Sequence, residues 1–111
     1  MAIGVEKANG AMHVVFPRNS PIPNAKILPV TTSYDGQTEA AIRVYQGDKE
    51  IARDNELLGE LVLSGLPPGP ARSAKLEVEF DVSIEGILHA SARDATTGRA
   101  VTSSIRLGPG L

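Results

Sequence analysis

The sequence predicts an all-β domain of about eight short strands, of the sandwich or barrel kind. Eleven glycines and eight prolines interrupt the 111-residue chain at short intervals, which leaves little room for long helices. Between them lie short segments rich in Val, Ile, Leu and Thr. Several of these segments alternate apolar and polar residues with a period of two, the pattern of a half-buried strand.

The first clear alternation is in EAAIRVYQ (39–46), which turns Ala40, Ile42 and Val44 to one side and Arg43 and Tyr45 to the wet side. The next segment, ending in LVLSGL, is expected to place Leu57, Leu61 and Leu63 on one face. Between the two, DKEIARDNELL has helix-forming residues, so we expect at most a short helical turn near 49–56.

Two further strands follow at 75–82 and 100–107. In KLEVEFDV every second residue is apolar: Leu76, Val78, Phe80 and Val82. In AVTSSIRL one side carries Val101, Ile105 and Leu107. Turn residues separate the strands: Asp35-Gly36 is a strong hairpin dipeptide, and Gly86 stands where a tight connection needs a positive φ.

Composition excludes several classes of protein. A net charge of −2, with both signs mixed along the chain, gives no sign of a basic surface for binding nucleic acid or an anionic membrane. Without cysteine there is no disulfide, zinc-thiolate site or thiol nucleophile, which suits a reducing compartment such as the cytoplasm. The length suits one domain, 1–111, and no signal peptide or membrane span is visible.

An acid/base site is one interpretation of DVSIEGILHASARDATTGR (81–99), because a small hydrolase could use His89 with Asp81 or Asp94. The other interpretation is structural and is the one we favour. It places Asp81 and His89 on wet strand faces, Glu85 in a turn, and Asp94 where its side chain can bond nearby backbone amides. His13, in AMHVVF, has no ligand at metal-binding spacing and is expected at the surface.

Five blocks in register resemble one family, the substrate-binding β-subdomain of DnaK-type 70-kDa heat-shock chaperones. The blocks are PRNSPIP (17–23), DGQTEAAIRVYQGDKEIARDNELLGEL (35–61), GLPPGP (65–70), LEVEFDV (76–82) and EGILHASARDATTG (85–98). The resemblance implies a sandwich of two four-stranded antiparallel sheets. It also implies binding of extended, apolar peptide segments of unfolded proteins in a channel between loops, by backbone hydrogen bonds and one apolar pocket.

The resemblance also implies which residues line that channel. They come from three regions of the chain and one later strand: Val5, Lys7 and Ala8; Val30, Thr31 and Ser33; Gln37, Ala40 and Ile42; and Leu76. By pattern alone Val30, Ala40, Ile42 and Leu76 would be plain core residues. Val30, Ile42 and Leu76 are the residues we expect to matter most for binding.

Two departures from the family predict altered binding. Bacterial relatives usually carry a phenylalanine at the position of Val30 and a valine at that of Ala40, so a wider pocket that accepts larger side chains is expected. Ala8 and Ser33 occupy the pair that arches over the peptide in relatives, where at least one residue is often larger. We therefore expect a weaker arch and faster peptide release.

Other positions match residues that, in relatives, contact the helical lid or the ATPase domain. Asp35 matches a latch to the helical lid, while the latch arginine position falls on Ala71, with Arg72 one place on. Arg18 and Asn19 match a surface that faces the ATPase domain in relatives. The sequence reads as a piece without ATPase domain, interdomain linker or lid, the lid being expected to start at LGPGL (107–111). It is therefore expected to be no enzyme and to need no cofactor, because ATP would belong to the missing domain.

The implied partners are unfolded peptides, the ATPase domain and lid of the full-length chain, and a J-domain co-chaperone. The lidless chain could also self-associate through the open channel or an edge strand. A dedicated client-binding module of the iron-sulfur scaffold chaperones, which share this subdomain, is an open alternative.

Overall fold

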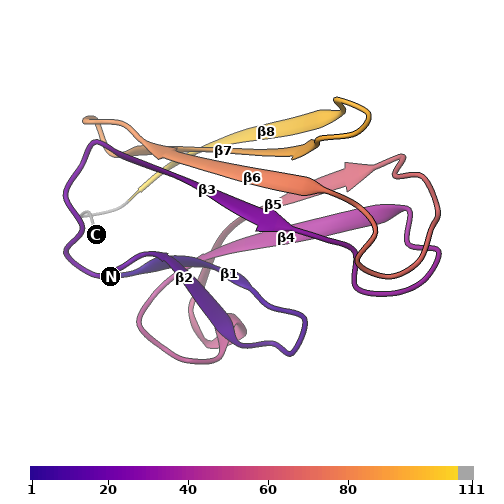
Figure 1. Cartoon of the computed structure of the whole chain (residues 1–111). Helices are drawn as coiled ribbons and strands as arrows, with labels where there is room; N and C mark the ends of the chain where they lie inside the picture. Colours follow the sequence, from indigo (N-terminus) through magenta and orange to yellow (C-terminus); the bar gives the residue numbers. More distant parts are fainter. Residues whose placement is uncertain (108–111) are drawn as a thin grey trace.

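Two antiparallel sheets of four strands each face one another in the computed structural model, which describes residues 1–107 (Figure 1). One sheet has the strand order β2-β1-β4-β5 and the other β3-β6-β7-β8. The strands are β1 (Ile3–Glu6), β2 (Met12–Phe16), β3 (Asn24–Val30), β4 (Glu39–Gln46), β5 (Glu56–Ser64), β6 (Leu76–Val82), β7 (Ile87–Asp94) and β8 (Ala100–Arg106). The prediction of an all-β sandwich is confirmed. Of the expected start of the lid, LGPGL (107–111), residues 108–111 lie outside the described residues.

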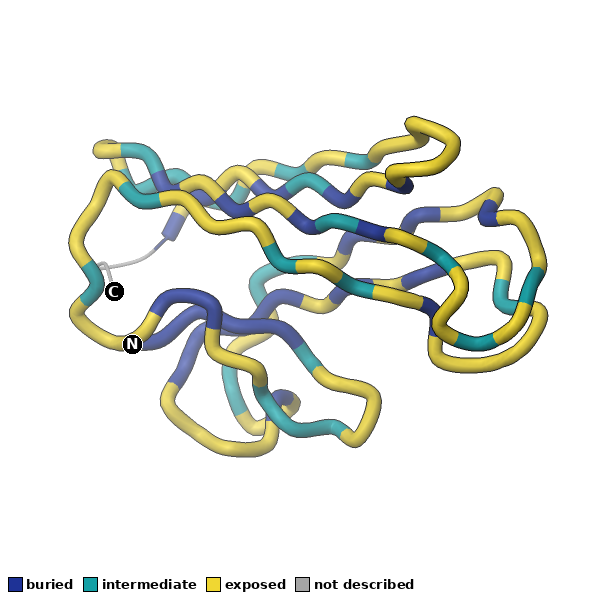
Figure 2. Tube along the Cα trace, in the orientation of Figure 1, coloured by how far each residue is buried: buried dark blue, intermediate teal, exposed yellow. Residues whose placement is uncertain are grey.

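The core lies between the inner faces of the two sheets, where buried and exposed residues alternate along the strands (Figure 2). β6 shows this most clearly: Leu76, Val78, Phe80 and Val82 are all at most 3% exposed. Both sheets contribute to the cluster, with Ile3, Phe16, Val44 and Leu63 from one and Phe80 and Leu88 from the other. Period-two patterning therefore predicted the inner face of β6 correctly.

A bulge between β4 and β5 overturns one of the sequence predictions, and a second is wrong beside it. Val44 pairs with Gly59 and Tyr45 with Leu57, so Leu58 is an extra residue that reverses the alternation. As a result Leu57, expected beside Leu61 and Leu63, is 54% exposed. Tyr45 was expected on the wet face but is buried; the extra residue is on β5 and does not account for this, and the Tyr45 hydroxyl donates to Glu6 of β1. The short helical turn between these strands is a 3₁₀ helix, Ala52–Asp54, as expected.

The loops gather at the two ends of the sandwich. Glu6 pairs with Met12 and Ile3 with Phe16, so the β1–β2 loop and the β2–β3 loop lie at opposite ends of this hairpin. The β3–β4 and β5–β6 loops are joined by backbone hydrogen bonds, from Gly36 to Gly69 at 2.7 Å and from Arg72 to Thr32 at 2.9 Å. The candidate site lies toward the end formed by these two loops, because Thr31, Ser33 and Gln37 line it.

Candidate functional site

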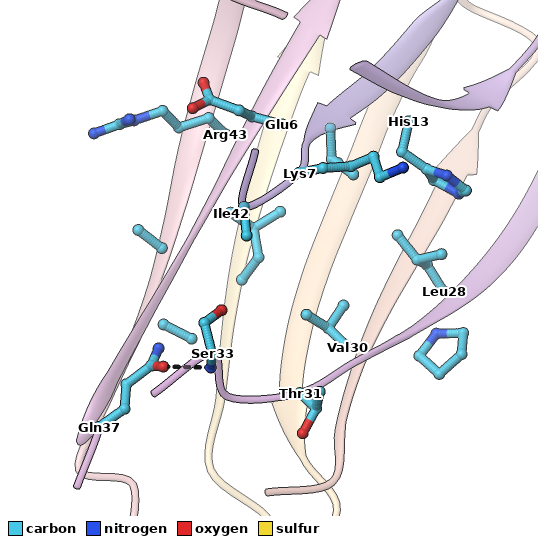
Figure 3. A pocket seen from close by; sticks show the side chains of 15 residues that line it. Glu6, Lys7, His13, Leu28, Val30, Thr31, Ser33, Gln37, Ile42 and Arg43 are labelled. Carbon is cyan, nitrogen blue, oxygen red and sulfur yellow. Dashed lines mark hydrogen bonds between the residues drawn. The ribbon is translucent and has the colours of Figure 1, made fainter. Parts of the chain in front are cut away.

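A groove of about 570 Å³ opens between β1, β2 and β4 on one side and β3 and its following loop on the other (Figure 3). Its volume is in the range of natural ligand pockets. The residues that line it are Val5, Glu6, Lys7, Ala8, His13, Leu28, Pro29, Val30, Thr31, Ser33, Gln37, Ala40, Ala41, Ile42 and Arg43.

The middle of the groove is apolar because it continues the core to the surface. Val5, Ala40 and Ile42 are each 6–7% exposed and belong to the core cluster, while Leu28 and Val30 of β3 pack against that cluster from the other side. In Figure 3 the side chains of Val30 and Ile42 lie across from one another. An aliphatic side chain entering here would contact both sheets.

One end of the groove carries uncharged hydrogen-bonding groups. Gln37 accepts a hydrogen bond from the backbone N–H of Ser33, 2.7 Å from Oε1, and its Nε2 donates to the carbonyl of Glu39 at 2.6 Å. Thr31 donates through Oγ1 to the carbonyl of Ala74 at 2.8 Å. These bonds fix the loop that forms the rim between β3 and β4.

The proline-rich β5–β6 loop braces this rim from outside the groove. Asp35 accepts a hydrogen bond from the backbone N–H of Ala71, with 2.8 Å between Oδ1 and N. Leu66 donates from its backbone to the carbonyl of Thr38 at 2.9 Å. The rim loop is thus held at both ends by a loop that contributes no residue to the groove lining.

A charged network lies along the β1–β4 edge of the groove. Tyr45 donates its hydroxyl to Oε1 of Glu6 at 2.9 Å, and Arg43 Nε donates to Oε2 of Glu60 at 2.8 Å. Burial, together with the nearby Glu6 carboxylate, raises the pKa of Tyr45 above its ordinary value. The hydrogen bond and charge of Glu60 raise the pKa of Arg43. Both Glu6 and Arg43 therefore have partners within the domain.

The groove brings together nine of the ten residues that the family resemblance implied. They are Val5, Lys7, Ala8, Val30, Thr31, Ser33, Gln37, Ala40 and Ile42. Leu76 is the exception, because it is 3% exposed and does not line the groove. It pairs with Val30 in the sheet, so it packs in the core beside a groove residue.

The residues matched to lid and interdomain contacts lie outside the lining. Asp35 and Arg72 lie in the two linked loops, and the backbone of Arg72 adopts a φ of 64°. Arg18 and Asn19 are exposed in the β2–β3 loop, which lies at the end of the β1–β2 hairpin away from the β1–β2 loop. Their predicted contacts are with parts outside this chain.

Sequence reasoning missed several groove residues, notably Glu6, His13, Leu28 and Arg43. His13 was expected only as a surface residue, and it is exposed. Its register partner is Val5, which lies on the groove floor, and strand pairing of this kind could have indicated that His13 lines the groove too.

Of the residues considered for hydrolysis, His89 and Asp81 lie on the outer face of the β3-β6-β7-β8 sheet. His89 pairs with Asp81 on β6 and Ser104 on β8, with 2.9 Å between His89 Nδ1 and Ser104 Oγ. Asp94 instead is 2% exposed and its Oδ1 accepts a hydrogen bond from the backbone N–H of Thr96 at 2.8 Å. As expected, Asp94 shapes the next turn; it lies on the opposite strand face from His89.

Two further features bear on function. Among residues 1–107, no three His, Asp or Glu side chains gather in a way that could hold a metal ion. In the same part of the chain, no helix is long and apolar enough to cross a membrane.

Fold and groove define a β-sandwich with an apolar, ligand-sized groove. The family model described as Hsp70 protein matches residues 1–111. The chaperone protein DnaK of Thermosipho africanus is 46% identical over 99 residues, covering 89% of this chain. Those of Thermosipho melanesiensis and Thermotoga maritima are 46% and 44% identical over 92% and 89% of it. The chain therefore belongs to the Hsp70 family, and it spans about 17% of the length of these relatives.

Proposed function

We propose that this chain binds extended, apolar peptide segments of unfolded proteins in the groove. The observation that carries the proposal is an apolar floor between two polar rims, in a chain of the Hsp70 family. Val5, Val30 and Ile42 supply the floor, while Ser33 and Gln37 supply hydrogen-bonding groups on one rim.

This arrangement suits a ligand of variable sequence. Every peptide carries the same backbone N–H and C=O groups, so contacts to the backbone are indifferent to sequence. One apolar pocket then adds a mild preference. Fully burying a leucine-sized side chain supplies about 1.5–3 kcal/mol before the cost of ordering the peptide.

In the longer protein, an ATPase domain would control peptide affinity by coupling two conformations of the whole molecule. We further propose that Asp35 and Arg72 face the lid and that Arg18 and Asn19 face the ATPase domain. A J-domain co-chaperone and a cytoplasmic location complete this proposal, because the relatives are DnaK chaperones.

Fluorescence anisotropy with a short labelled Leu-centred peptide, competed by the unlabelled peptide, tests this function. Val30→Glu should abolish binding, because it places a charge on the apolar floor. The matched control is Ile84→Glu: Ile84 is 72% exposed in the β6–β7 turn, so binding should be unchanged. Circular dichroism checks that both variants fold. Saturable binding that survives Val30→Glu would contradict the proposal.

A peptide array distinguishes a general chaperone from a dedicated client-binding module of the iron-sulfur scaffold type. A general chaperone should retain many unrelated apolar peptides, whereas a module dedicated to one client should retain a single motif.

A further inference from the structure

Two hydrogen-bond-donating side chains of the groove have no partner within the part of the chain that the structure describes. Lys7 and His13 both line the groove. In Figure 3 the Lys7 ammonium points toward the His13 ring, on the side of the groove away from Glu6 and Arg43. Neither side chain has a hydrogen-bond or ion-pair partner among residues 1–107.

The other charges of the groove are already compensated. Glu6 is the only carboxylate among the lining residues; it accepts the hydroxyl of Tyr45, and its charge interacts favourably with Arg43. Arg43 is held by Glu60, 2.8 Å away. The side that carries Lys7 and His13 is therefore the part of the groove left with an uncompensated positive charge.

The groove is also different at its two ends. The end with Thr31, Ser33 and Gln37 offers uncharged groups, and Lys7 and His13 lie toward the other end, with the apolar floor between them (Figure 3). A peptide whose aliphatic side chain sits on the floor would place a neighbouring side chain toward Lys7 and His13. A carboxylate is the peptide group that best accepts hydrogen bonds from an ammonium and an imidazole N–H.

We propose that Lys7 and His13 form a carboxylate subsite that selects peptides in which Asp or Glu flanks the central apolar residue. The subsite rests on the proposed peptide-binding function and gives the groove a preferred peptide direction, because only one flank reaches it. An exposed ion pair is weak, so the preference should be about two- to five-fold. It should fade as salt shortens the range of the attraction.

Competition anisotropy against the labelled Leu-centred peptide tests the subsite with four unlabelled peptides. Each carries Asp or Asn, on either the N-terminal or the C-terminal side of the leucine. At low salt the Asp peptide should bind about two- to five-fold tighter than its Asn partner on one flank only. At about 1 M salt the two should bind alike.

The variant Lys7→Gln/His13→Gln should remove this preference, so that the Asp and Asn peptides of each pair compete equally well. Arg106→Gln is the control, because it also removes one positive charge but lies on β8, outside the groove. It should keep the preference, which separates the subsite from general charge attraction.

Equal binding of Asp and Asn peptides on both flanks would overturn the subsite and leave the peptide-binding function standing. A preference that persists in the double variant would overturn it too. Failure of all four peptides to compete, Asn peptides included, would overturn the peptide-binding function and the subsite with it.

Discussion

The carboxylate of Asp35 accepts a hydrogen bond from the backbone N–H of Ala71, 2.8 Å away, and so ties the β3–β4 loop to the proline-rich β5–β6 loop. Two residues before it in the chain, Ser33 lines the groove. The family resemblance assigns Asp35 a contact with a lid, and within this chain the same carboxylate has a second role. It holds the rim of the groove in place.

Replacing Asp35 with alanine should loosen that rim. We expect the free energy of unfolding to fall by about 1 kcal/mol and peptide dissociation to become about three-fold faster. Asp35→Asn keeps an acceptor oxygen and should lie between this variant and the wild type. Urea unfolding and stopped-flow dissociation measure the two effects. A wild-type dissociation rate in Asp35→Ala would show that the rim needs no such brace.

Ala40 tests the width of the pocket. The wild-type groove is expected to accept peptides centred on Val, Leu or Phe. Ala40→Val narrows the floor and should weaken binding of the Phe peptide roughly ten-fold relative to the Val peptide. Ala100→Val, at an exposed position of β8, should leave the order unchanged. Competition anisotropy with the three peptides measures this, and a strict preference for Val in the wild type would contradict the expected wide pocket.

The small residues on the two rims predict fast release. Ala8 and Ser33 are both exposed and both line the groove. Ala8→Met adds apolar area over the peptide and should slow dissociation by about three- to ten-fold. The same change at Ala95, exposed in the β7–β8 loop, is the control. Stopped-flow traces that are identical for Ala8→Met and the wild type would count against the arch.

Tyr45 predicts a loss of stability at alkaline pH. Its pKa is raised in the folded state by burial and by Glu6, so folding favours the neutral phenol. This contribution is fully present below about pH 10, the ordinary pKa of tyrosine, and is lost as pH rises through the folded-state pKa.

Urea unfolding between about pH 9 and pH 12 measures that loss. In Tyr45→Phe the decline with pH should be shallower than in the wild type. The second tyrosine of the chain, Tyr34, is 61% exposed, so Tyr34→Phe should decline as the wild type does. If the free energy of unfolding fell with pH equally steeply in Tyr45→Phe and the wild type, ionisation of Tyr45 would not be the cause of the loss.

The fold could be predicted because alternation was strict where strands pair without interruption. Leu76, Val78 and Phe80 were placed correctly by period two alone. Leu57 was placed wrongly, because the extra residue Leu58 depends on how β4 and β5 pair, and no local pattern records that. Tyr45 was expected to be exposed but is buried, with its hydroxyl bonded to Glu6 of the neighbouring strand.

The groove could not be predicted from the alternation of apolar and polar residues alone. Its floor residues look like core residues in the sequence, since Val5 and Ile42 belong to the core cluster and also reach the surface. The resemblance to a family supplied that distinction, yet it also named Leu76, which only packs beside Val30. His13 was missed because its place beside Val5 follows from strand register.

Amide chemical-shift mapping by NMR, with a Leu-centred peptide added to saturation, tests peptide binding in the groove most directly. The signals of Val5, Val30 and Ile42 should move, while those of His89 and Ser104, on the outer face of the β3-β6-β7-β8 sheet, should stay in place. Shifts confined to that outer face, or no shifts at saturating peptide, would contradict the account.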